Sequence, residues 1–473
     1  MSDPLWTFEK ALAATAGRAE GSDTPELTSV SMDSRTVKPG ALFTAIRGDN
    51  LDGHDYVGQA FQAGAVAALV ADDAKLQDTG TLIRVPDTLE ALNRLGAAAR
   101  ARSNACVIAV TGSVGKTGTK EALRLALGAS GSVHASQKSY NNHWGVPLTL
   151  ANFARGLDFG VFEVGMNHPG EITPLTRLIR PHIAIITTVE PVHLEFFTSV
   201  EQIGEAKAEI FDGLEPGGTA ILNRDNPHFE LLKSRASEAG AKRIIAFGAH
   251  DEAEAKLMEL RSTGDASEVE AVIRGEKISY RIGAPGRHLV MNSLAVLAAL
   301  AAAGTDVQAG AHALGAYHAQ TGRGARTQFI LGDGRVTLID ESYNANPASM
   351  RAALDSLGDL PRAELPRRIA VLGDMLEMGE TSPRLHAELA QPVDAAGVDV
   401  VFACGPHMRA LYDALPESRR GAYAKSSEGL EAALLKTVQA GDAVMIKGSL
   451  GSAMGPLVEA LRVHLKQMGA QFG

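Results

Sequence analysis

The chain has 473 residues, of which 45% are hydrophobic and 21% are charged, and its formal net charge is -10. This composition excludes a disordered or fibrous protein, and the length predicts about three domains. The acidic balance excludes broad nucleic-acid binding, which leaves a basic footprint on a domain, although a nucleotide can still bind locally.

The cysteines, the N-terminus and the hydropathy also indicate the cellular compartment of the protein. The two cysteines, Cys106 and Cys404, lie far apart in apolar runs and are predicted to be buried thiols of a reducing compartment. The N-terminus has no basic region followed by an apolar one, which indicates that there is no signal peptide. The most apolar stretch, 289–304, is interrupted by polar residues and is too short to span a bilayer. These features predict a cytoplasmic protein without membrane insertion and without a nucleic-acid partner.

Residues 1–103 are predicted to form a small N-terminal α/β domain, because short apolar runs alternate with turn signals and end in a helix at 88–102. Within this domain, Ser34 and Arg35 lie close in sequence to a glycine turn and to Gly48. A serine hydroxyl, an arginine fork and a glycine turn are groups that bind a diphosphate. A surface loop held by salt bridges is the alternative that these residues leave open.

Residues 104–322 alternate strands and helices, which predicts a central domain with a mostly parallel sheet and crossover helices. Ligands of such sheets bind beyond the carboxyl ends of the strands, so polar residues there are the candidates for chemistry. The candidate strands are 107–110, 159–164, 183–188, 219–222 and 243–247.

The first of these strands runs into a phosphate-binding turn that is followed by a helix at 119–127. The turn consists of Gly112, Ser113, Val114, Gly115, Lys116 and Thr117. Its glycines let backbone N–H groups approach phosphate oxygens, Lys116 adds a positive charge, and the Thr117 hydroxyl can ligate Mg²⁺. Two residues separate the glycines, where the standard pattern has four. A glycine turn with a solvated lysine is the weaker alternative, because strand, turn, Lys-Thr pair and helix coincide.

Three side chains further along are candidates for a metal site. Glu163 closes an otherwise apolar strand, and a buried carboxylate requires a partner such as a metal or an arginine. His193 follows the third strand and is either a ligand or a structural hydrogen-bonding group. Lys207 occupies an apolar position on a predicted helical face at 203–214. It either reaches water or is held inside by carboxylates, a metal or a covalent modification.

The end of the central domain is less informative. The segment 251–274 is charged and poorly patterned, which predicts an exposed β excursion with little chemistry. After it, an alanine- and leucine-rich helix contains Asn292 near its start. This amide can contact a purine, and N-terminal capping of the helix is the alternative.

Residues 323–473 are predicted to form a separate Rossmann-like C-terminal domain, because the pattern breaks at 321–324 and the alternation then starts again. The domain lacks a Gly-x-Gly-x-x-Gly turn, so dinucleotide binding is not implied. Polar residues cluster after its strands at 340–347, 373–375 and 447–449. The predicted elements are strands at 336–339, 368–372, 398–403 and 443–446 and helices at 349–357 and 384–396.

In this order the motifs resemble those of the Mur ligases, the ATP-dependent amide-forming enzymes of peptidoglycan precursor synthesis. The resemblance spans nearly the whole chain, and the family's phosphate loop has the short Thr-Gly-x-x-Gly-Lys-Thr form found at 111–117. Three further motifs look like those of the branch that adds D-alanyl-D-alanine. They are Asn141-Asn142-x-x-Gly145-Val146-Pro147, Ala206-Lys207-x-Glu209-Ile210-Phe211 and Ser342-Tyr343-Asn344-Ala345-Asn346-Pro347.

The resemblance implies a first domain that holds the UDP end of the substrate, a second that binds ATP with Mg²⁺, and a third that closes over the nucleotide. The loop from Gly112 to Thr117 would hold the ATP phosphates. Residues implied in catalysis are Lys116, Glu163, His193 and Lys207. Mg²⁺ would be surrounded by Thr117, Glu163, His193 and a carbamoylated Lys207. Other ATP contacts would come from Asn292, Arg323 and Asp340. Substrate contacts would come from Ser34, Arg35, Gly48, Asn142, Tyr343, Asn344 and Asn346.

The implied reaction joins D-alanyl-D-alanine to UDP-N-acetylmuramoyl-tripeptide through an acyl phosphate made with ATP, in a monomeric enzyme. Two rivals stay open: a sister ligase that adds a single amino acid, and a nucleotide-dependent regulatory ATPase that joins nothing. The sequence departs from the family at Leu450, where arginine is frequent after Lys-Gly-Ser, and at Gly455, where an acidic residue is frequent. No substrate contact is therefore assigned to the Lys447 loop.

Overall fold

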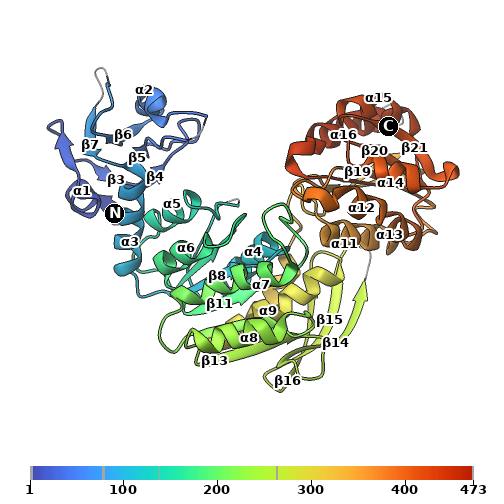
Figure 1. Ribbon diagram of the computed structural model, residues 1–473, viewed down its shortest axis with the longest axis horizontal. Helices are drawn as coiled ribbons and strands as arrows, with labels where there is room; N and C mark the ends of the chain where they lie inside the picture. The colour runs from blue at the N-terminus through green and yellow to red at the C-terminus, as the bar shows by residue number, and fades with distance from the viewer. Residues whose placement is uncertain (1–3, 49, 77–79, 138, 263–264, 471–473) are drawn as a thin grey trace.

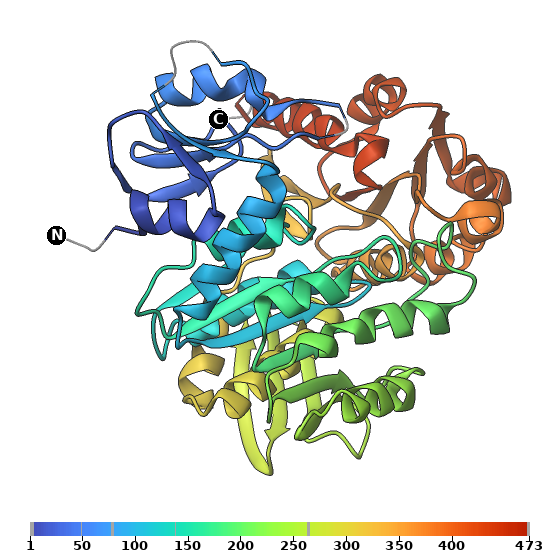
Figure 2. The same ribbon diagram turned by 60° about the vertical axis from the view of Figure 1, so that its left-hand side comes forward.

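The computed structural model describes residues 4–48, 50–76, 80–137, 139–262 and 265–470. In chain order it forms three lobes, each built around its own β-sheet, and the central lobe joins the other two (Figure 1). After a turn of 60° the N-terminal and C-terminal lobes still lie on the same side of the central lobe (Figure 2). The predicted α/β class with three domains is confirmed, and the boundaries after residues 103 and 322 stay predictions.

A five-stranded sheet of order β2-β7-β6-β5-β4 forms the N-terminal lobe; β2 is antiparallel to β7 and the other pairs are parallel. β1 and β3 pair separately as an antiparallel ribbon. The strands are β1 (Trp6–Thr7), β2 (Arg18–Glu20), β3 (Glu26–Leu27), β4 (Ser29–Ser31), β5 (Ala41–Thr44), β6 (Ala65–Ala71) and β7 (Thr81–Val85). The helices are α1 (Phe8–Thr15), η1 (Gly53–Tyr56), α2 (Val57–Gln62) and α3 (Thr88–Ala101).

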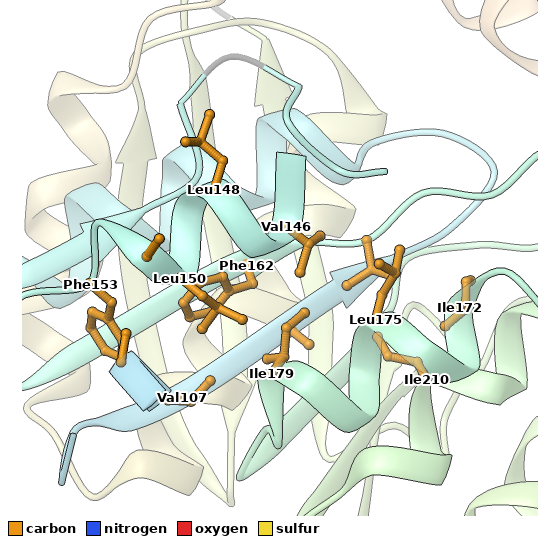
Figure 3. Close-up of a cluster of buried hydrophobic side chains, with 14 of the residues drawn as sticks. Val107, Val146, Leu148, Leu150, Phe153, Phe162, Ile172, Leu175, Ile179 and Ile210 are labelled. Carbon is orange, nitrogen blue, oxygen red and sulfur yellow. The ribbon is translucent and has the colours of Figure 1, made fainter. Parts of the chain in front are cut away.

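Helix α3 connects the first lobe to the second, and it confirms the helix predicted at 88–102. It begins where Asp87 accepts hydrogen bonds from the backbone N–H groups of Leu89 and Glu90, which satisfies donors that the first turn would leave free. α3 packs against α5 of the central lobe. Together these helices cover one face of the central sheet over a buried apolar cluster that includes Val107 and Phe162 (Figure 3).

The central lobe contains a nine-stranded sheet of order β16-β15-β14-β13-β12-β11-β8-β10-β9, parallel from β14 to β9. The strands are β8 (Cys106–Thr111), β9 (Val133–Ala135), β10 (Phe159–Glu163), β11 (Ile183–Ile186), β12 (Thr219–Asn223), β13 (Arg243–Gly248), β14 (Ala255–Ser262), β15 (Ser267–Ile273) and β16 (Glu276–Ile282). The helices are α4 (Lys116–Leu127), α5 (Gly145–Ala151), α6 (Ile172–Ile179), α7 (Val200–Ala208), η2 (Glu209–Gly213), α8 (Phe229–Glu238), α9 (Arg287–Ala303), α10 (Val307–Ala313) and η3 (Leu314–Ala316).

Strand β8 lies inside this sheet and is covered by helices on both faces. Val107 and Ala109 belong to the cluster under α3, α5 and α6, whereas Ile108 and Val110 belong to the cluster under α4 and α9. A continuous apolar run is typical of a parallel strand that is buried on both sides. The five strands predicted for this domain are confirmed as β8, β10, β11, β12 and β13.

The expectation of an exposed β excursion at 251–274 is half wrong. The segment does form β structure, but β14 and β15 continue the central sheet instead of leaving it. One face of β15 is buried, with Val269, Ala271 and Ile273 in the core under α9. The charged residues that suggested exposure lie on the opposite, solvent-facing side of the strand. An antiparallel strand with one buried face shows this alternation of apolar and polar residues.

The helical face predicted at 203–214 is correct only in its first half. Ile203, Lys207 and Ile210 are all buried, but α7 ends at Ala208 and the chain continues as the 3₁₀ turn η2. The Thr176 hydroxyl donates a 2.7 Å hydrogen bond to the Ile210 carbonyl, so α6 supplies a partner for a carbonyl of η2.

The C-terminal lobe has a six-stranded sheet of order β17-β18-β22-β19-β20-β21, in which β17 is antiparallel to β18 and the other pairs are parallel. The strands are β17 (Ala325–Leu331), β18 (Gly334–Glu341), β19 (Arg367–Gly373), β20 (Val400–Cys404), β21 (Arg420–Ala424) and β22 (Asp442–Lys447). The helices are α11 (Pro347–Gly358), η4 (Gly379–Thr381), α12 (Ser382–Ala387), α13 (Ala390–Ala395), α14 (Arg409–Ala414), η5 (Glu417–Arg419), η6 (Glu428–Leu430), α15 (Glu431–Thr437), η7 (Leu450–Ser452) and α16 (Met454–Ala470).

The single helix predicted at 384–396 is wrong, because the structure has α12 and α13 in its place. Pro392 explains the break: proline lacks a backbone N–H and is tolerated in the first turn of a helix but not in its interior. The edge strands β17 and β21 were not predicted. Within the described residues, no helix is long and apolar enough to cross a membrane.

Candidate functional site

The phosphate loop lies between the end of β8 and the first turn of α4. Gly112 and Gly115 have φ angles of 148° and 87°, which favour glycine. Lys116 is half-buried as the first residue of α4, and its Nζ donates a 2.7 Å hydrogen bond to the Gly112 carbonyl. Burial lowers the pKa of Lys116, while nearby Glu163 raises it and Arg323 lowers it further. Loop, carboxylate and both cations therefore share one site at a helix N-terminus, where anions bind.

The loop is held from behind by the segment that follows β11. Ser113 Oγ donates to the Glu190 carbonyl at 3.1 Å and accepts from the Glu190 N–H at 2.9 Å. Thr187 Oγ1 donates to the Val114 carbonyl at 2.6 Å. The Ser113 hydroxyl and the Val114 carbonyl therefore serve the framework of the loop, and a ligand would meet other groups of the loop.

Replacement of Gly112 by alanine tests this close packing. The added Cβ would lie 1.9 Å from Thr187 Oγ1, at a φ that alanine rarely adopts. Because strain of this kind costs about 1–3 kcal/mol, we expect Gly112→Ala to weaken ADP binding about ten-fold, measured by calorimetry. Gly156→Ala is the control, since Gly156 also has a positive φ but, in the described part of the chain, no atom lies within 4 Å of the added Cβ. Unchanged ADP binding by Gly112→Ala would contradict the assignment of the loop.

Glu163 ends β10 in register with Val110 of β8, which places its carboxylate beside the loop. The residue is 1% exposed, and its Oε1 accepts a 2.7 Å hydrogen bond from Asn141 Nδ2. Its Oε2 is buried and has no hydrogen-bond partner among the described residues. A buried, unpaired carboxylate oxygen is costly, and it is the type of ligand that Mg²⁺ prefers.

The buried Thr117 hydroxyl adds a second oxygen near the loop and lies 3.4 Å from Ser139 Oγ. In the parts of the chain that the structure describes, no group of three or more His, Cys, Asp and Glu side chains could hold a metal. Mg²⁺ commonly uses one or two carboxylates and takes its other ligands from phosphates and water. Glu163 and Thr117 therefore fit Mg²⁺ that arrives with a nucleotide.

Lys207 lies in the last turn of α7 and is 2% exposed. Across the described ranges it forms no hydrogen bond through its amine and no ion pair with a carboxylate. Burial lowers its pKa well below the usual value for lysine, and the charge of Lys116 lowers it further. The side chain is thus a buried amine close to the cation of the phosphate loop, and both its burial and that cation disfavour its charged form.

His193 lies at the junction of the central and C-terminal lobes. Its Nδ1 is hydrogen-bonded to Glu377 Oε2 at 2.5 Å, and this bond lowers the pKa of the Glu377 carboxyl. His193 has a positive φ of 55° and Glu377 one of 62°. The C-terminal lobe therefore engages one of the two ring nitrogens of this metal-ligand candidate.

Arg323 reaches the phosphate loop from the start of the third lobe. Its Nη2 donates a 3.1 Å hydrogen bond to Ser139 Oγ, and its guanidinium lies 4.1 Å from the centre of the Tyr343 ring. Asp340 is buried and holds the adjacent turn: one carboxylate oxygen accepts from the Gly322 N–H, and the other accepts from Ser342. Asp340 therefore positions the segment that carries Arg323, with both of its oxygens in use.

The residues predicted to hold a dipeptide follow β18. Tyr343 is partly exposed under Arg323, whereas the Asn346 side chain caps α11 by accepting from the Ser349 N–H. Asn344 Oδ1 accepts from the Ala345 N–H, and the Asn344 carbonyl accepts from Lys447 Nζ at 3.0 Å. Within this group, Tyr343 and Asn344 are exposed and available to a substrate, whereas Asn346 is buried.

Ser34 and Arg35 were predicted to contact the UDP-sugar, and Gly48 and Asn142 were predicted to contact a substrate. Ser34 Oγ donates to Gln59, and Arg35 forms a two-pronged ion pair with Asp33 while remaining largely exposed. Gly48 lies against the Trp144 ring, and a Cβ at this position would approach it to 3.1 Å. Asn142 Oδ1 accepts from the Gly145 N–H at the start of α5.

Asn292 of α9 lies against the phosphate loop, because a Cβ added to Gly115 would be 2.6 Å from its Nδ2. Asn292 also lines a small pocket beside α4 with Gly118 and Tyr317. Burial raises the pKa of Tyr317 to about 12, which keeps its hydroxyl protonated. The Asn292 amide does not cap its own helix, whose first residue is Arg287, so the capping alternative is excluded.

The structure adds three polar residues that were not predicted as site residues. Ser139 lies between Thr117 and Arg323, Asn141 holds Glu163, and Glu377 holds His193. Asn141 stands in the Asn-Asn motif and could have been found from it. Ser139 and Glu377 carry no local sequence signal, since their partners Arg323 and His193 are each 184 residues away.

Comparison with known proteins covers almost the whole chain. The Mur ligase family catalytic-domain model matches residues 26–111, the Mur ligase middle-domain model matches 110–300, and the Mur ligase glutamate-ligase-domain model matches 325–450. The UDP-N-acetylmuramoyl-tripeptide--D-alanyl-D-alanine ligase of Rickettsia prowazekii is 34% identical over 96% of this chain and 99% of its own. The ligase of the same name from Escherichia coli is 34% identical over 94% of this chain and 96% of its own.

Solved structures agree with these matches. MurF from Acinetobacter baumannii superposes with a TM-score of 0.83 and 27% identity, covering 96% of this chain and 98% of its own. MurF ligase from Thermotoga maritima, solved in complex with ADP, shares the fold with a TM-score of 0.76 and 24% identity over 93% of this chain and 98% of its own. With relatives above 30% identity over nearly the full length, the chain belongs to the Mur ligase family.

Proposed function

We propose that the protein is the ATP-dependent ligase that joins D-alanyl-D-alanine to UDP-N-acetylmuramoyl-tripeptide. The products are UDP-N-acetylmuramoyl-pentapeptide, ADP and phosphate. The similarity to relatives of that name over nearly the full chain supports the choice of substrates. The observation that carries the ligase chemistry is the meeting of Lys116, Glu163 and Arg323 at one helix N-terminus. Two lobes then contribute charge to one phosphate site, as an enzyme that closes over ATP requires.

In this proposal the loop from Gly112 to Thr117 holds the ATP phosphates, and Asn292 contacts the adenine-ribose end. Thr117 and Glu163 hold Mg²⁺, with His193 and a carbamoylated Lys207 as its further ligands or neighbours. When bound, Mg²⁺ supplies positive charge that screens the phosphates from an approaching carboxylate. Arg323 approaches the γ-phosphate, and Asp340 keeps the turn that carries it in place, as the hydrogen bonds of Asp340 support.

The reaction proceeds in two steps. The terminal carboxylate of the tripeptide attacks the γ-phosphorus of ATP, which forms an acyl phosphate and releases ADP. The free amine of D-alanyl-D-alanine then attacks the acyl carbon, which forms the amide, loses a proton and releases phosphate. Because two anions meet in the first step, Lys116 and Arg323 act by neutralising charge on the transferring phosphoryl group. Closure of the lobes excludes water, which would otherwise hydrolyse the acyl phosphate.

The outer lobes supply the two peptide substrates. We assign the UDP-sugar to the first lobe, near Ser34, Arg35, Gly48 and Asn142, which lie where that lobe meets the central one. The dipeptide is assigned to the third lobe, at Tyr343, Asn344 and Asn346. The exposed Tyr343 ring supports this second assignment, because it packs against Arg323, whose charge acts on Lys116 of the phosphate loop.

The test is ADP release in the presence of ATP, Mg²⁺ and UDP-N-acetylmuramoyl-tripeptide, with and without D-alanyl-D-alanine, while product mass is followed. We expect ADP and a product heavier by the dipeptide to appear together only in the complete mixture. Turnover with a single amino acid in place of the dipeptide would favour a sister ligase. ADP release that is independent of both peptide substrates, without a gain in mass, would favour a regulatory ATPase.

A further inference from the structure

The contact between His193 and Glu377 joins the central and C-terminal lobes. Besides the ring-to-carboxylate bond, the Glu195 N–H donates a 3.3 Å hydrogen bond to the Glu377 carbonyl. Leu194 packs against the apolar cores of both the central and the C-terminal lobe. The segment 193–195 and residue Glu377 therefore form one docking contact with polar and apolar parts.

Both partners of the ring contact have backbone conformations that need support. The φ angles of 55° for His193 and 62° for Glu377 cost non-glycine residues free energy, and such strain persists where surrounding contacts over-determine it. On the central side, Glu190 is fixed to the phosphate loop through both of its backbone hydrogen bonds to Ser113. His193 thus stands three residues from a point anchored on the loop.

The bond to Glu377 determines which form of the His193 ring is available. A carboxylate can only accept, so Nδ1 must carry the proton. In the neutral ring Nε2 then bears the lone pair, and among the described residues nothing hydrogen-bonds to Nε2. Metal-binding histidines commonly donate their other ring N–H to a carboxylate, which fixes the ring and raises its basicity.

We propose that Glu377 of the C-terminal lobe is a positioning residue for the metal site, holding His193 so that Nε2 faces the metal. This inference rests on the proposed function, in which His193 belongs to the Mg²⁺ site. Docking of the C-terminal lobe and metal binding then favour each other, because a coupling free energy between two binding events is reciprocal. Binding of the nucleotide with its metal is thereby coupled, through the Glu377 side chain, to docking of the third lobe.

The experiment measures Mn²⁺ binding to the full-length protein in the presence of ADP, by paramagnetic resonance of the free ion. We expect Glu377→Ala to raise the Kd for Mn²⁺ about ten-fold, the usual effect of losing such a carboxylate. Glu377→Gln keeps an acceptor for Nδ1–H, so its Kd should stay closer to that of the unaltered protein. Glu380→Ala is the matched control, because Glu380 is an exposed carboxylate of η4, three residues after Glu377, with no ion pair among the described residues.

A second readout follows docking itself. Mn²⁺ with ADP should slow hydrogen exchange at the Glu195 amide in the unaltered protein, and this slowing should be lost in Glu377→Ala. Equal Mn²⁺ affinity of Glu377→Ala and the unaltered protein would overturn the inference and leave the proposed function intact. Equal weakening by Glu377→Gln and Glu377→Ala would also overturn it. Failure of the unaltered protein to bind Mn²⁺ with ADP at all would overturn the proposed nucleotide site as well.

Discussion

Lys116→Ala is expected to reduce kcat for ligation by about 10³-fold or more while the protein stays folded. The ammonium is the positive charge placed at the start of α4, and it has no substitute within the loop itself. Removing a group that stabilises charge on a transferring phosphoryl group commonly costs this much. ADP and product would be quantified by chromatography under saturating substrates, so that the loss is read in turnover and not only in binding.

In contrast to its activity, the thermal stability of Lys116→Ala should not fall. Burial depresses the pKa of Lys116, so the folded protein disfavours its charged form, and removing the charge relieves that cost. We therefore expect the midpoint of thermal unfolding to be unchanged or higher. Lys233→Ala, at an exposed lysine of α8, is the control and should keep full activity. Normal turnover by Lys116→Ala would refute the phosphate-loop assignment.

The parts of the fold that the sequence predicted are those with coinciding local signals. Strand β8, the glycine turn and α4 follow one another within about twenty residues, and each is recognisable by its own pattern. The predicted helical face continued past Ala208, where α7 ends. The prediction was wrong there because the Ile210 carbonyl accepts its hydrogen bond from Thr176 of another helix, α6, which no local pattern indicates. The edge strand β21 was missed because none of its residues is buried. Burial alternates in the second half of β17, but the exposed residue between Phe329 and Leu331 is the apolar Ile330, so the sequence does not show the alternation.

The same distinction holds for the site. Glu163 was predictable because a carboxylate at the end of an apolar strand is conspicuous, and its unpaired Oε2 fits that expectation. The role of Asp340 could not be predicted from the sequence, since its two carboxylate oxygens are used within the protein to hold the turn before Arg323. Contacts between lobes, such as His193 with Glu377, depend on how the lobes dock, and no local pattern encodes that.

Lys207→Ala is expected to lower kcat by about 10²-fold or more, and formate or acetate should restore part of the activity. Burial and the charge of Lys116 lower the pKa of the Lys207 amine, which favours its neutral form, and a neutral amine can attack CO₂, forming an N–C bond and losing a proton. The resulting carbamate would place a negative charge next to the Lys116 ammonium and attract it, and a small carboxylate would supply the same negative charge in the cavity left by alanine.

Lys207→Arg tests whether activity requires the carbamate or only a positive charge at this position, because arginine stays protonated and cannot react with CO₂. We expect this variant to be inactive and not to be restored by formate, since its side chain still fills the site. Carbon-13 spectra recorded in labelled bicarbonate should show a carbamate signal in the unaltered protein and none in Lys207→Arg. Full activity of Lys207→Ala without added carboxylate would remove Lys207 from the mechanism, whereas a lost activity without any carbamate signal would assign it a role as a neutral amine. The buried position of Lys207 next to the phosphate loop therefore makes it the side chain whose chemical form decides the charge of the whole site.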